Sequence, residues 1–501
     1  MTIRRSQSLA NLMSDIADMP DVMVSGVALD SRLLGAGDLY LAVAGATTHG
    51  LAFVEQVINS QAAAVLIDEH LDDSFDAALQ QLRVAGIVVG KVPQLKNRVG
   101  EIAADFYGRP SQHLNVVAVT GTDGKTSVCL FIATALRQLG HSCGYIGTLG
   151  WGVDELASTA LTTPDAVSLQ RMLAELRAQG AATVALEASS HGISEGRLDD
   201  VAIDVAVLTN IGRDHLDYHQ TLEHYKAAKA QLFSWPSLRA IVVNRHDELG
   251  AELLAESTIP GYAFTSKSAS SAGSDNTHAL IEGRDIQLTA AGIQFDLVDE
   301  SQSHTVTSGL FGRFNVENLL ACHGVLLALG HAANDSANAL GALQAVPGRM
   351  EQFSAKGRPT VVVDFAHTPQ ALQSAIAALR DHADGVLWVV FGCGGDRDKG
   401  KRLPMGRAAE AANHVIVTDD NPRWESSQSI IDAILSGMQN PQAAIVIADR
   451  REAIAYAITT AAENDVVLIA GKGHEDYQIN NGKRLPFSDR LVVDALLQEA
   501  C

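Results

Sequence analysis

Residues 116–127 read Val-Val-Ala-Val-Thr-Gly-Thr-Asp-Gly-Lys-Thr-Ser, and this stretch decides the fold class of the chain. Its valine-rich start is typical of a buried parallel strand, and the residues that follow predict a helix over Val128–Leu139. Backbone N–H groups at the start of such a helix, together with a lysine and a threonine hydroxyl, bind phosphate and Mg²⁺. The stretch therefore predicts a nucleotide-binding α/β domain, with a purely structural turn as the alternative. The loop is shorter than the general phosphate loop, because Val119 stands where that pattern has glycine.

Length, charge and cysteine content limit the possible classes of protein. The 501 residues are too many for one core and suggest about three domains. A net charge of −21 argues against a nucleic-acid partner, because phosphate backbones require a basic surface. No signal peptide is expected, and no apolar run approaches the roughly 18 residues of a membrane span. The five scattered cysteines favour a reducing cytoplasm as the location.

Short apolar runs alternating with helical stretches predict three α/β domains. A small domain is expected over residues 1–112, a central ATP-binding domain over 113–345, and a second doubly wound, Rossmann-like domain over 346–501. Antiparallel strands are expected within 280–307, and a serine-rich loop over 266–276. The strands predicted around the candidate sites are Thr183–Glu187, Val205–Asn210, Val361–Asp364, Gly385–Phe391, His414–Thr418, Ala443–Ile447 and Asp465–Ala470.

Polar residues follow two strands of the central domain. Glu187 ends one strand, and residues 210–219, Asn-Ile-Gly-Arg-Asp-His-Leu-Asp-Tyr-His, follow the next. Carboxylates and other polar groups at the ends of parallel strands are placed to bind Mg²⁺ beside a phosphate loop, although capping residues would look the same. Lys229 lies in the predicted helix 225–233, where composition alone predicts an exposed lysine.

Three strands of the last domain end in glycine- or proline-containing loops with charged residues, 391–402, 419–423 and 470–475. Doubly wound domains build one site from several such loops. Arg397 and Arg423 could hold a carboxylate, and Glu475 could hold an ammonium group. The loops therefore predict a zwitterionic, amino-acid-like ligand, with three solvated loops as the alternative.

These stretches together resemble the Mur ligases of bacterial cell-wall synthesis and, through them, the folylpolyglutamate synthetases. The resemblance runs from Leu29 to Arg490. It rests on Gly-Thr-x-Gly-Lys-Thr at 121–126, Glu-Ala-Ser-Ser-His-Gly at 187–192, Asn-Ile-x-Arg-Asp-His-Leu-Asp-Tyr-His at 210–219, Gly-Arg-Phe-Asn-x-x-Asn at 312–318, Asp-Phe-Ala-His-Thr-Pro at 364–369, Asp-Asn-Pro-Arg at 420–423 and Gly-Lys-Gly-His-Glu at 471–475.

The resemblance implies an amide ligase that uses ATP and Mg²⁺. The last two motifs imply the branch that adds meso-2,6-diaminopimelate to the D-glutamate γ-carboxylate of UDP-MurNAc-L-Ala-D-Glu, in the synthesis of a peptidoglycan precursor. The carboxylate would be phosphorylated to an acyl phosphate, which the amine then attacks. Arg423 would select diaminopimelate over lysine, because lysine-adding relatives lack this arginine. A monomer is expected, with lid-like movement between the second and third domains.

The resemblance also implies roles for single residues. The triphosphate would be held by Gly121, Thr122, Asp123, Gly124, Lys125, Thr126 and Ser127, and the rest of the nucleotide by Asn315, Asn318, Arg349 and Asp364. Mg²⁺ would be held by Thr126, Glu187, His215 and a carbamylated Lys229, and Lys125, Glu187, His215 and Lys229 would be catalytic. The UDP-muramoyl dipeptide would contact Leu29, Ser31, Ala46, Thr47, Thr48, Thr162, Thr163, Ser189, Glu195 and Arg197. Diaminopimelate would contact Arg397, Asp420, Asn421, Pro422, Arg423, Gly471 and Glu475.

The chain departs from the family pattern at three places. Asp123 stands where asparagine is common, Glu195 stands where a glutamine occurs, and residues 46–48 differ from the uridine loops of relatives. Two other functions fit part of the sequence. A folylpolyglutamate synthetase would need neither the N-terminal domain nor the Asp-Asn-Pro-Arg loop, and a non-catalytic nucleotide switch would not need three amino-acid-binding loops.

Overall fold

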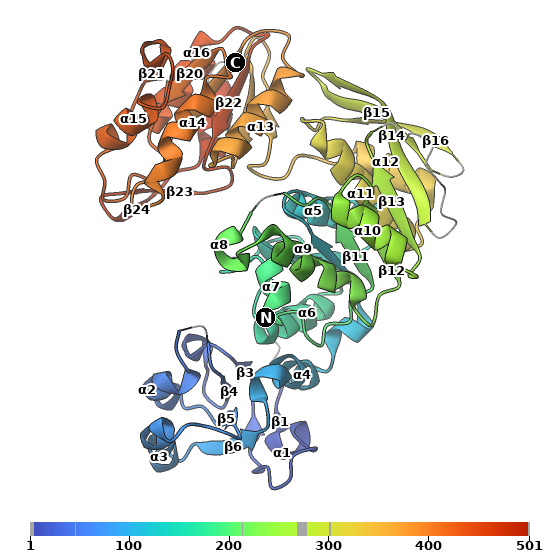
Figure 1. Cartoon of the computed structure of the whole chain (residues 1–501), viewed down its shortest axis with the longest axis vertical. Helices are drawn as coiled ribbons and strands as arrows, with labels where there is room; N and C mark the ends of the chain where they lie inside the picture. The colour runs from blue at the N-terminus through green and yellow to red at the C-terminus, as the bar shows by residue number, and fades with distance from the viewer. Residues whose placement is uncertain (1–4, 46, 213, 268–277, 300–301, 499–501) are drawn as a thin grey trace. The chain divides into compact units, whose positions relative to one another are not determined.

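The computed structural model describes residues 5–45, 47–212, 214–267, 278–299 and 302–498 (Figure 1). They form two compact units. The N-terminal unit comprises Met1–Phe264, Gly273–Ala279 and Gly324–His331, and the C-terminal unit comprises Thr265–Ala272, Leu280–His323 and Ala332–Cys501. Most of the serine-rich loop predicted over 266–276 lies outside the described residues.

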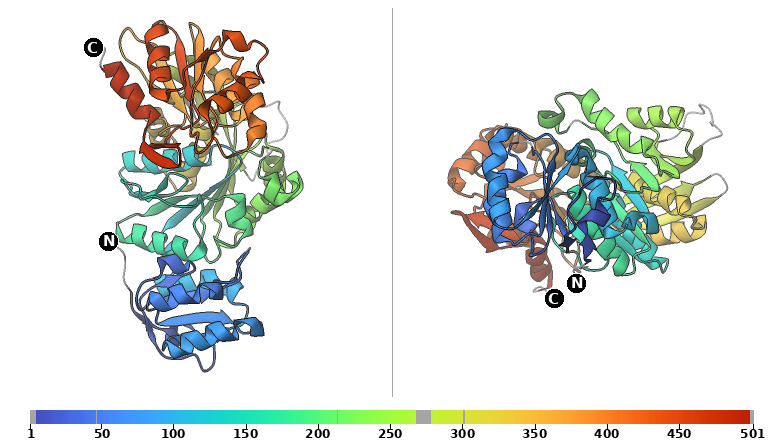
Figure 2. Two further views of the ribbon diagram at one scale, coloured as in Figure 1. Left: turned by 90° about the vertical axis from the view of Figure 1, so that its left-hand side faces the viewer. Right: turned by 90° about the horizontal axis from the view of Figure 1, so that it is seen from below.

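The first part of the N-terminal unit is a parallel sheet covered by helices on both faces (Figure 2). The sheet contains, in order, β3 (Val27–Ala28), β4 (Leu39–Ala42), β5 (Ala64–Asp68) and β6 (Val88–Val92). Along β4, Leu39 and Leu41 pack on one face and Tyr40 and Ala42 on the other, as the two-residue period of a strand requires. The flanking elements are β1 (Gln7–Ser8), β2 (Met23–Val24), α1 (Leu9–Leu12), α2 (Val54–Asn59), α3 (Asp76–Val84) and α4 (Leu95–Tyr107).

The second part of this unit contains seven consecutive strands of a ten-stranded sheet, in the order β13-β12-β11-β7-β10-β8-β9. All neighbouring strands are parallel except the hairpin of β8 and β9. The strands are β7 (Asn115–Thr120), β8 (Cys143–Gly147), β9 (Gly150–Gly152), β10 (Thr183–Glu187), β11 (Val205–Leu208), β12 (Ala240–Asn244) and β13 (Gly261–Thr265). The helices are α5 (Lys125–Gln138), α6 (Ala166–Ala178), α7 (Ser190–Ser194), α8 (Leu216–His219), α9 (Leu222–Ala230) and α10 (Glu248–Glu256).

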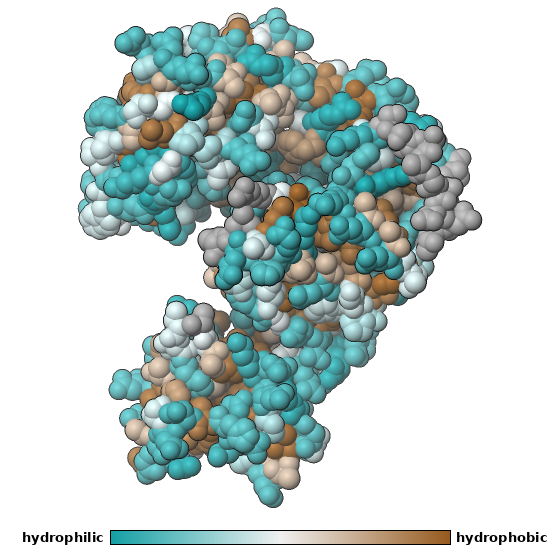
Figure 3. Space-filling model, viewed as in Figure 1, coloured by the Kyte–Doolittle hydropathy of each residue, from teal (hydrophilic) through white to brown (hydrophobic). Residues whose placement is uncertain are grey.

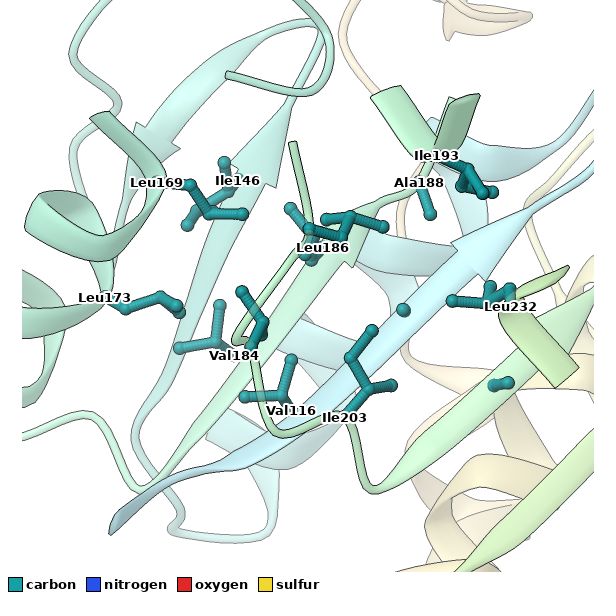
Figure 4. Packing of buried hydrophobic residues seen from close by; sticks show 14 of the residues in the cluster. Val116, Ile146, Leu169, Leu173, Val184, Leu186, Ala188, Ile193, Ile203 and Leu232 are labelled. Carbon is teal, nitrogen blue, oxygen red and sulfur yellow. The ribbon is translucent and has the colours of Figure 1, made fainter. Parts of the chain in front are cut away.

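The register of this sheet brings the functional loops to one edge. Glu187 pairs with Val119, and Leu208 pairs with Thr120, so β7, β10 and β11 end at the same level. Beneath them, Leu169 and Leu173 of α6 face Ile146, Val184 and Leu186 (Figure 4). A tightly packed core of this kind holds the strand ends in place for the loops that follow.

An antiparallel meander and two helices lie mostly in the C-terminal unit. These are β14 (His278–Thr289), β15 (Gly292–Val298), β16 (Ser303–Ser308), α11 (Phe314–Ala328) and α12 (Ala333–Gly341). A second sheet follows in the order β17-β18-β22-β19-β20-β21, parallel except for β17. Its strands are β17 (Glu351–Phe353), β18 (Thr360–Asp364), β19 (Leu387–Phe391), β20 (His414–Val417), β21 (Ile445–Val446) and β22 (Val466–Ala470), and a hairpin of β23 (Tyr477–Asn480) and β24 (Lys483–Pro486) follows.

Helices cover both faces of the second sheet (Figure 1). One face packs against α13 (Pro369–Arg380), α14 (Arg402–Ala409) and α15 (Ser427–Leu435), and the other packs against α16 (Arg450–Thr460) and α17 (Asp489–Gln498). The predicted α/β class is confirmed.

Several predicted boundaries differ from the structure by a few residues, and two of the differences have a clear cause. Helix α5 begins at Lys125 rather than Val128, because Gly124 adopts a left-handed backbone and leads directly into the first turn. The strand predicted over Ala443–Ile447 is mostly wrong, since β21 contains only Ile445–Val446 and pairs with β20 at the sheet edge. Ala443 instead belongs to a short 3₁₀ helix that starts at Pro441.

His382 connects the meander of the C-terminal unit to its second sheet. Its Nε2 accepts the Gly312 N–H at 2.9 Å, so its Nδ1 carries the proton that is donated to the Thr289 carbonyl at 2.7 Å. The ring also stacks on Phe311 at 4.3 Å between centroids. Burial lowers the pKa of His382, which favours the neutral ring that these two hydrogen bonds require.

A buried ion pair joins α16 to α17. The Arg450 guanidinium donates to both carboxylate oxygens of Asp489 at 2.8 Å, and both side chains are inaccessible to solvent. The same guanidinium donates to the Ala470 carbonyl at 2.9 Å and to the Asp419 carbonyl at 3.2 Å. Arg450 therefore fixes the backbone at the carboxyl ends of β22 and β20.

We predict that Arg450→Met destabilises the C-terminal unit by about 3–5 kcal/mol, because it leaves the Asp489 carboxylate buried without a partner. Chemical denaturation measures the change. Arg451→Met at the exposed neighbouring position is the matched control and should shift stability by no more than about 0.5 kcal/mol. Adding Asp489→Leu should recover part of the loss. Equal effects of the Arg450 and Arg451 substitutions would contradict the role of the ion pair.

A second buried polar group lies between α11 and α12. Nδ1 of His323 is 2.7 Å from Oγ of Ser336, and both side chains are fully buried. Burial lowers the pKa of His323 from 6.5 to about 4, although Asp299 at 3.7 Å opposes this shift. The folded unit therefore excludes a proton that the unfolded chain binds below pH 6.5.

We predict that the C-terminal unit loses about 3 kcal/mol of stability through His323 as the pH falls. The contribution is fully present above pH 6.5 and is lost as the pH falls toward 4, because protons bind preferentially to the unfolded chain. Denaturation curves between pH 7 and 4 should show a shallower pH dependence for His323→Gln than for the wild type. His113→Gln, at an exposed position, should leave the dependence unchanged, and a wild-type slope in His323→Gln would refute the assignment.

Hydrophilic residues predominate on the face drawn in Figure 3, and hydrophobic residues occur there in small groups. Among the described residues, no helix has the length and apolar character needed to span a membrane.

Candidate active site

The phosphate loop joins β7 to α5 and has the backbone that its glycines allow. Gly121 and Gly124 have φ angles of 144° and 83°, which residues with a side chain rarely adopt. Lys125 donates from Nζ to the carbonyls of Gly121 at 2.9 Å and Thr122 at 2.8 Å. Thr126, at the start of α5, is mostly buried, and Asp123 is exposed. The N-terminus of α5 and the Lys125 ammonium together favour an anion at this loop.

The residues after β11 hold the loop in this conformation. Oγ1 of Thr209 donates to the Asp123 carbonyl at 2.6 Å, and it occupies the space that a Cβ at Gly121 would need. Asn210 accepts the N–H groups of Thr122 at 2.8 Å and Asp123 at 3.0 Å, through its backbone and side-chain oxygens respectively. The glycine at 121 is therefore required both by its φ angle and by this close approach.

Lys229 of α9 lies beneath the phosphate loop. Its side chain is buried, with 1% of the residue exposed, and its Nζ donates to the Gly121 carbonyl at 2.7 Å. The same nitrogen also lies 4.7 Å from the centroid of the Tyr225 ring. Burial lowers the pKa of Lys229 well below its ordinary value, and the nearby charge of Lys125 lowers it further. Composition alone predicted that Lys229 is exposed. This prediction is wrong, because α9 packs against α7.

The Glu187 carboxylate, at the end of β10, is buried and oriented by its neighbours. Oε1 accepts the Tyr145 hydroxyl at 2.6 Å and the Thr148 N–H at 3.0 Å, and Oε2 accepts the Thr148 hydroxyl at 3.1 Å. Burial raises the pKa of Tyr145, and the negative charge and hydrogen bond of Glu187 raise it further, so this hydroxyl stays a donor. Gly147 leaves room for both groups, since a Cβ there would clash with them.

The residues expected along the muramoyl-dipeptide path lie next to Glu187. Oγ1 of Thr163 donates to the Glu187 carbonyl at 2.7 Å and lies 2.9 Å from Oγ of Ser189. Arg197 donates to the Thr163 carbonyl at 2.8 Å and forms an ion pair with Glu195 at 2.6 Å. The last of the five expected dipeptide residues is Thr162, whose Oγ1 lies 3.0 Å from the Thr148 hydroxyl that donates to Glu187. All five are therefore connected to the Glu187 strand end.

His215 lies in the loop after β11 with a left-handed φ of 53°. Its ring is 4.9 Å from that of His191 and 6.3 Å from that of Tyr225, and 47% of its side chain is exposed. Within the described ranges, no three His, Cys, Asp or Glu side chains are placed to hold a metal ion. Mg²⁺ bound to nucleotide phosphates keeps several waters and needs only one or two protein oxygens, so the Glu187 carboxylate and the Thr126 hydroxyl fit that ion.

The expected uridine residues lie at the carboxyl ends of β3 and β4. Ser31 is buried and donates to Gln56 at 2.6 Å, whereas Thr47 and Thr48 are exposed; Ala46 is outside the described residues. Leu29 lines a cavity of about 310 Å³. The cavity is also lined by charged residues, Asp30, Asp38, Asp165 and Arg171.

The expected nucleotide residues of the C-terminal unit are mostly held by local contacts. Asn318 donates to the Asn315 side chain at 2.9 Å, and Asn315 donates to the Phe311 carbonyl at 2.7 Å. Asp364 accepts the N–H groups of Met350 and Ala366, both at 2.8 Å. Burial raises the pKa of Asp364. Arg349 lies over the Phe365 ring at 4.8 Å, and its buried Nε has no hydrogen-bond partner in the described structure.

Arg423 lies where two of the predicted amino-acid loops meet. Its Nη1 donates to the Gly395 carbonyl at 2.8 Å, and its backbone N–H donates to the Ile479 carbonyl at 2.9 Å. The Gly395 N–H in turn donates to the Asn421 carbonyl at 2.9 Å. Arg397 is exposed on the glycine loop. Both arginines are therefore carried by one pair of adjoining loops.

The third predicted loop contributes Gly471 and Glu475. Asn421 donates to Oε2 of Glu475 at 3.1 Å, which joins the loop after β20 to the loop after β22. Gly471 has a φ of 119°, and a Cβ there would lie 2.7 Å from the Asp420 carboxylate. Asp420, Asn421 and Pro422 are buried, and the hydrogen bonds between these loops bring Asn421, Arg423 and Glu475 together at the carboxyl edge of the second sheet.

Sequence reasoning did not assign four residues that hold these groups in place, Tyr145, Thr148, Arg450 and Lys472. Tyr145 lies within an apolar strand, and Thr148 follows it without a motif of its own. Arg450 precedes Ala453, Ile454 and Ala457 at helical spacing, so it could have been found as a charge on an apolar helix face. Lys472 lies in the Gly-Lys-Gly-His-Glu motif at 471–475, but the resemblance assigned ligand contacts there only to Gly471 and Glu475.

This chain is similar to known proteins over nearly its whole length. The models of the Mur ligase family match in three parts. The model described as "Mur ligase family, catalytic domain" matches residues 23–107, "Mur ligase middle domain" matches 119–326, and "Mur ligase, glutamate ligase domain" matches 348–473.

Relatives named UDP-N-acetylmuramoyl-L-alanyl-D-glutamate–2,6-diaminopimelate ligase match at full length. The protein of Xanthomonas oryzae pv. oryzae is 45% identical over 98% of this chain and 97% of its own, and that of Pseudomonas putida is 44% identical over 95% of each. A solved structure with the same name is 34% identical, covers 100% of this chain and 99% of its own, and has a TM-score of 0.70. The chain therefore belongs to the Mur ligase family.

Proposed function

We propose that this protein is an ATP-dependent ligase that joins meso-2,6-diaminopimelate to the D-glutamate γ-carboxylate of UDP-MurNAc-L-Ala-D-Glu, in the synthesis of a peptidoglycan precursor. The observation that carries the proposal is the amino-acid site, where Arg423 and Glu475 occupy adjoining loops at one sheet edge. A zwitterion with a second carboxylate matches such opposite charges. The relatives at about 45% identity carry the name of the same reaction.

The first half of the reaction activates the carboxylate. A carboxylate does not expel oxide, so one of its oxygens attacks the γ-phosphorus of ATP, and ADP leaves with the electrons of the broken P–O bond. The phosphate loop, with the α5 N-terminus and Lys125, stabilises the charge on the transferred group. Thr126 and Glu187 would hold Mg²⁺, which neutralises phosphate charge when bound.

The second half forms the amide. The diaminopimelate amine attacks the acyl carbon, and the tetrahedral intermediate expels inorganic phosphate and loses a proton. Thr163, Ser189 and Arg197 are adjacent to Glu187 and would position the dipeptide carboxylate. Most of the rate acceleration is then positioning and charge stabilisation, because the leaving group is already installed.

The folylpolyglutamate synthetase alternative shares the phosphate loop and the acyl-phosphate chemistry. It does not account for the parallel-sheet domain built from β3 to β6, or for Arg423 in the loop after β20. The relatives that match over nearly the whole chain are also named as diaminopimelate ligases. We therefore favour the diaminopimelate ligase.

We predict that phosphate release from ATP requires both UDP-MurNAc-L-Ala-D-Glu and meso-diaminopimelate. Arg423→Ala should raise the KM for diaminopimelate roughly ten- to a hundred-fold, the loss expected for one hydrogen bond to a charged group, with little change in the KM for ATP. Steady-state phosphate release measures both values. Arg407→Ala, at an exposed position of α14, is the matched control and should behave as wild type.

Two results of this assay would count against the proposal. Release that depends on a folate and glutamate would favour the synthetase alternative, and release that needs no amino acid would favour a nucleotide switch. Equal turnover of lysine and diaminopimelate by the wild type would remove only the assigned specificity.

Lys229 supports a second part of the proposal, a carbamate formed on its side chain. A neutral amine adds CO₂ to give R–NH–COO⁻ and a proton, and burial beside Lys125 favours the neutral amine. The product places a negative charge beneath the phosphate loop, where the unmodified amine is neutral. Such a carboxylate joins Glu187 and His215 as a candidate metal ligand.

We predict a ¹³C carbamate resonance when the protein is incubated with ¹³C-bicarbonate. The resonance should be absent from Lys229→Ala and present in Lys226→Ala, a matched control on the same helix whose ammonium pairs with Glu248. Ligase activity of Lys229→Ala should fall by at least the roughly 10–100-fold seen when a supporting group of a metal site is removed. Full activity in Lys229→Ala would exclude a functional carbamate.

A further inference from the structure

Lys472 follows β22 and is buried beneath the amino-acid loops. None of its surface is exposed to solvent. Its Nζ donates to Oε2 of Glu475 at 2.8 Å and to Oδ1 of Asn421 at 3.2 Å, and it lies 5.4 Å from the centroid of the Tyr477 ring. Burying an ammonium group costs several kcal/mol unless it is paired, so these acceptors decide where the side chain lies.

Asn421 turns this ion pair into a bridge between three segments. Its Oδ1 accepts from Lys472 and from the Ile479 N–H at 2.9 Å, while its Nδ2 donates to Oε2 of Glu475. A lysine and a backbone N–H are donors only, so the orientation of the amide is determined. The loop after β20, the loop after β22 and strand β23 are therefore joined at one point.

The two carboxylate oxygens of Glu475 differ in their hydrogen bonding. Oε2 accepts from both Lys472 and Asn421, whereas Oε1 has no hydrogen-bond partner among the described residues. The side chain is 21% exposed, so it reaches the surface of the site. One oxygen is thereby held, and the other is available to an ammonium group of the ligand.

We propose that Lys472 is a positioning residue of the amino-acid site. It touches no ligand, because it is fully buried, and it acts by fixing the Glu475 carboxylate and the Asn421 amide in the geometry that receives the ligand ammonium. A carboxylate held on one side loses less conformational entropy on binding than one that rotates freely. This inference rests on the proposed function, because it requires an amino-acid substrate at these loops.

The test is Lys472→Met, which keeps an unbranched side chain and removes the charge. Its KM for meso-diaminopimelate should rise roughly ten- to a hundred-fold, while its KM values for ATP and UDP-MurNAc-L-Ala-D-Glu stay within about twofold of wild type. Lys483→Met, at an exposed position of β24, is the matched control and should leave all three values unchanged.

A double-mutant cycle tests whether Lys472 acts through Glu475. Glu475→Gln alone should raise the KM for diaminopimelate, and adding Lys472→Met should raise it little further, because the group that Lys472 positions has already been changed. Additive effects of the two substitutions would overturn the inference. Loss of all three substrate affinities together, with a lower Tm, would assign Lys472 to stability alone and would also overturn it.

If Lys472→Met yields no folded protein, Lys472→Gln is measured in the same way, since it keeps one donor and loses the charge. A folded variant with an unchanged KM for diaminopimelate contradicts the positioning role, and so does failure of both variants to fold. A wild-type protein without diaminopimelate-dependent phosphate release refutes the proposed function instead. The two failures are therefore distinguishable.

Discussion

Two lysine side chains donate to one carbonyl oxygen, that of Gly121, and the shape of the phosphate loop depends on this contact. Lys125 reaches the oxygen from the start of α5, and Lys229 reaches it from α9, at 2.9 and 2.7 Å. The contact fixes the turn between β7 and α5 in a conformation that only glycine adopts readily. Burial lowers the pKa of Lys229, and the charge of Lys125, which this contact brings close, lowers it further. The shape of the loop and the reactivity of the amine therefore have a common origin.

The C-terminal unit uses buried cations in a comparable way. Arg450 donates to backbone carbonyls at the ends of β20 and β22, and Lys472 donates to the side chains of the loops that follow those strands. A buried ion pair is a weak source of stability, because desolvation offsets most of the attraction. Its directional hydrogen bonds, however, allow few alternative arrangements of the loops. In both units, geometry at the carboxyl edge of a sheet is thus maintained by polar groups that are not themselves exposed.

The sequence predicts the parts of this site that follow from local pattern. The apolar runs that become β10 and β18, and the carboxylates that end them at Glu187 and Asp364, could be read from periodicity and position. The burial of Lys229 could not, because α9 mixes charged residues with small apolar ones, and the burial depends on packing against α7 and the phosphate loop. Tyr145 and Lys472 were missed for the same reason. Tyr145 donates to Glu187, which lies 42 residues away in sequence, and one of the two acceptors of Lys472, Asn421, lies 51 residues away, so the sheet topology is needed to bring these pairs together.

His382 has a consequence for how this protein can be divided into fragments. Because its imidazole binds both Thr289 and Gly312, the antiparallel meander and the second sheet share a hydrogen-bonded junction. An expressed fragment that begins at β17 would lose both partners and expose the Phe311-stacked face of the ring. A fragment that begins ahead of β14 retains the junction, and is the better starting point for studying amino-acid binding apart from the phosphate loop.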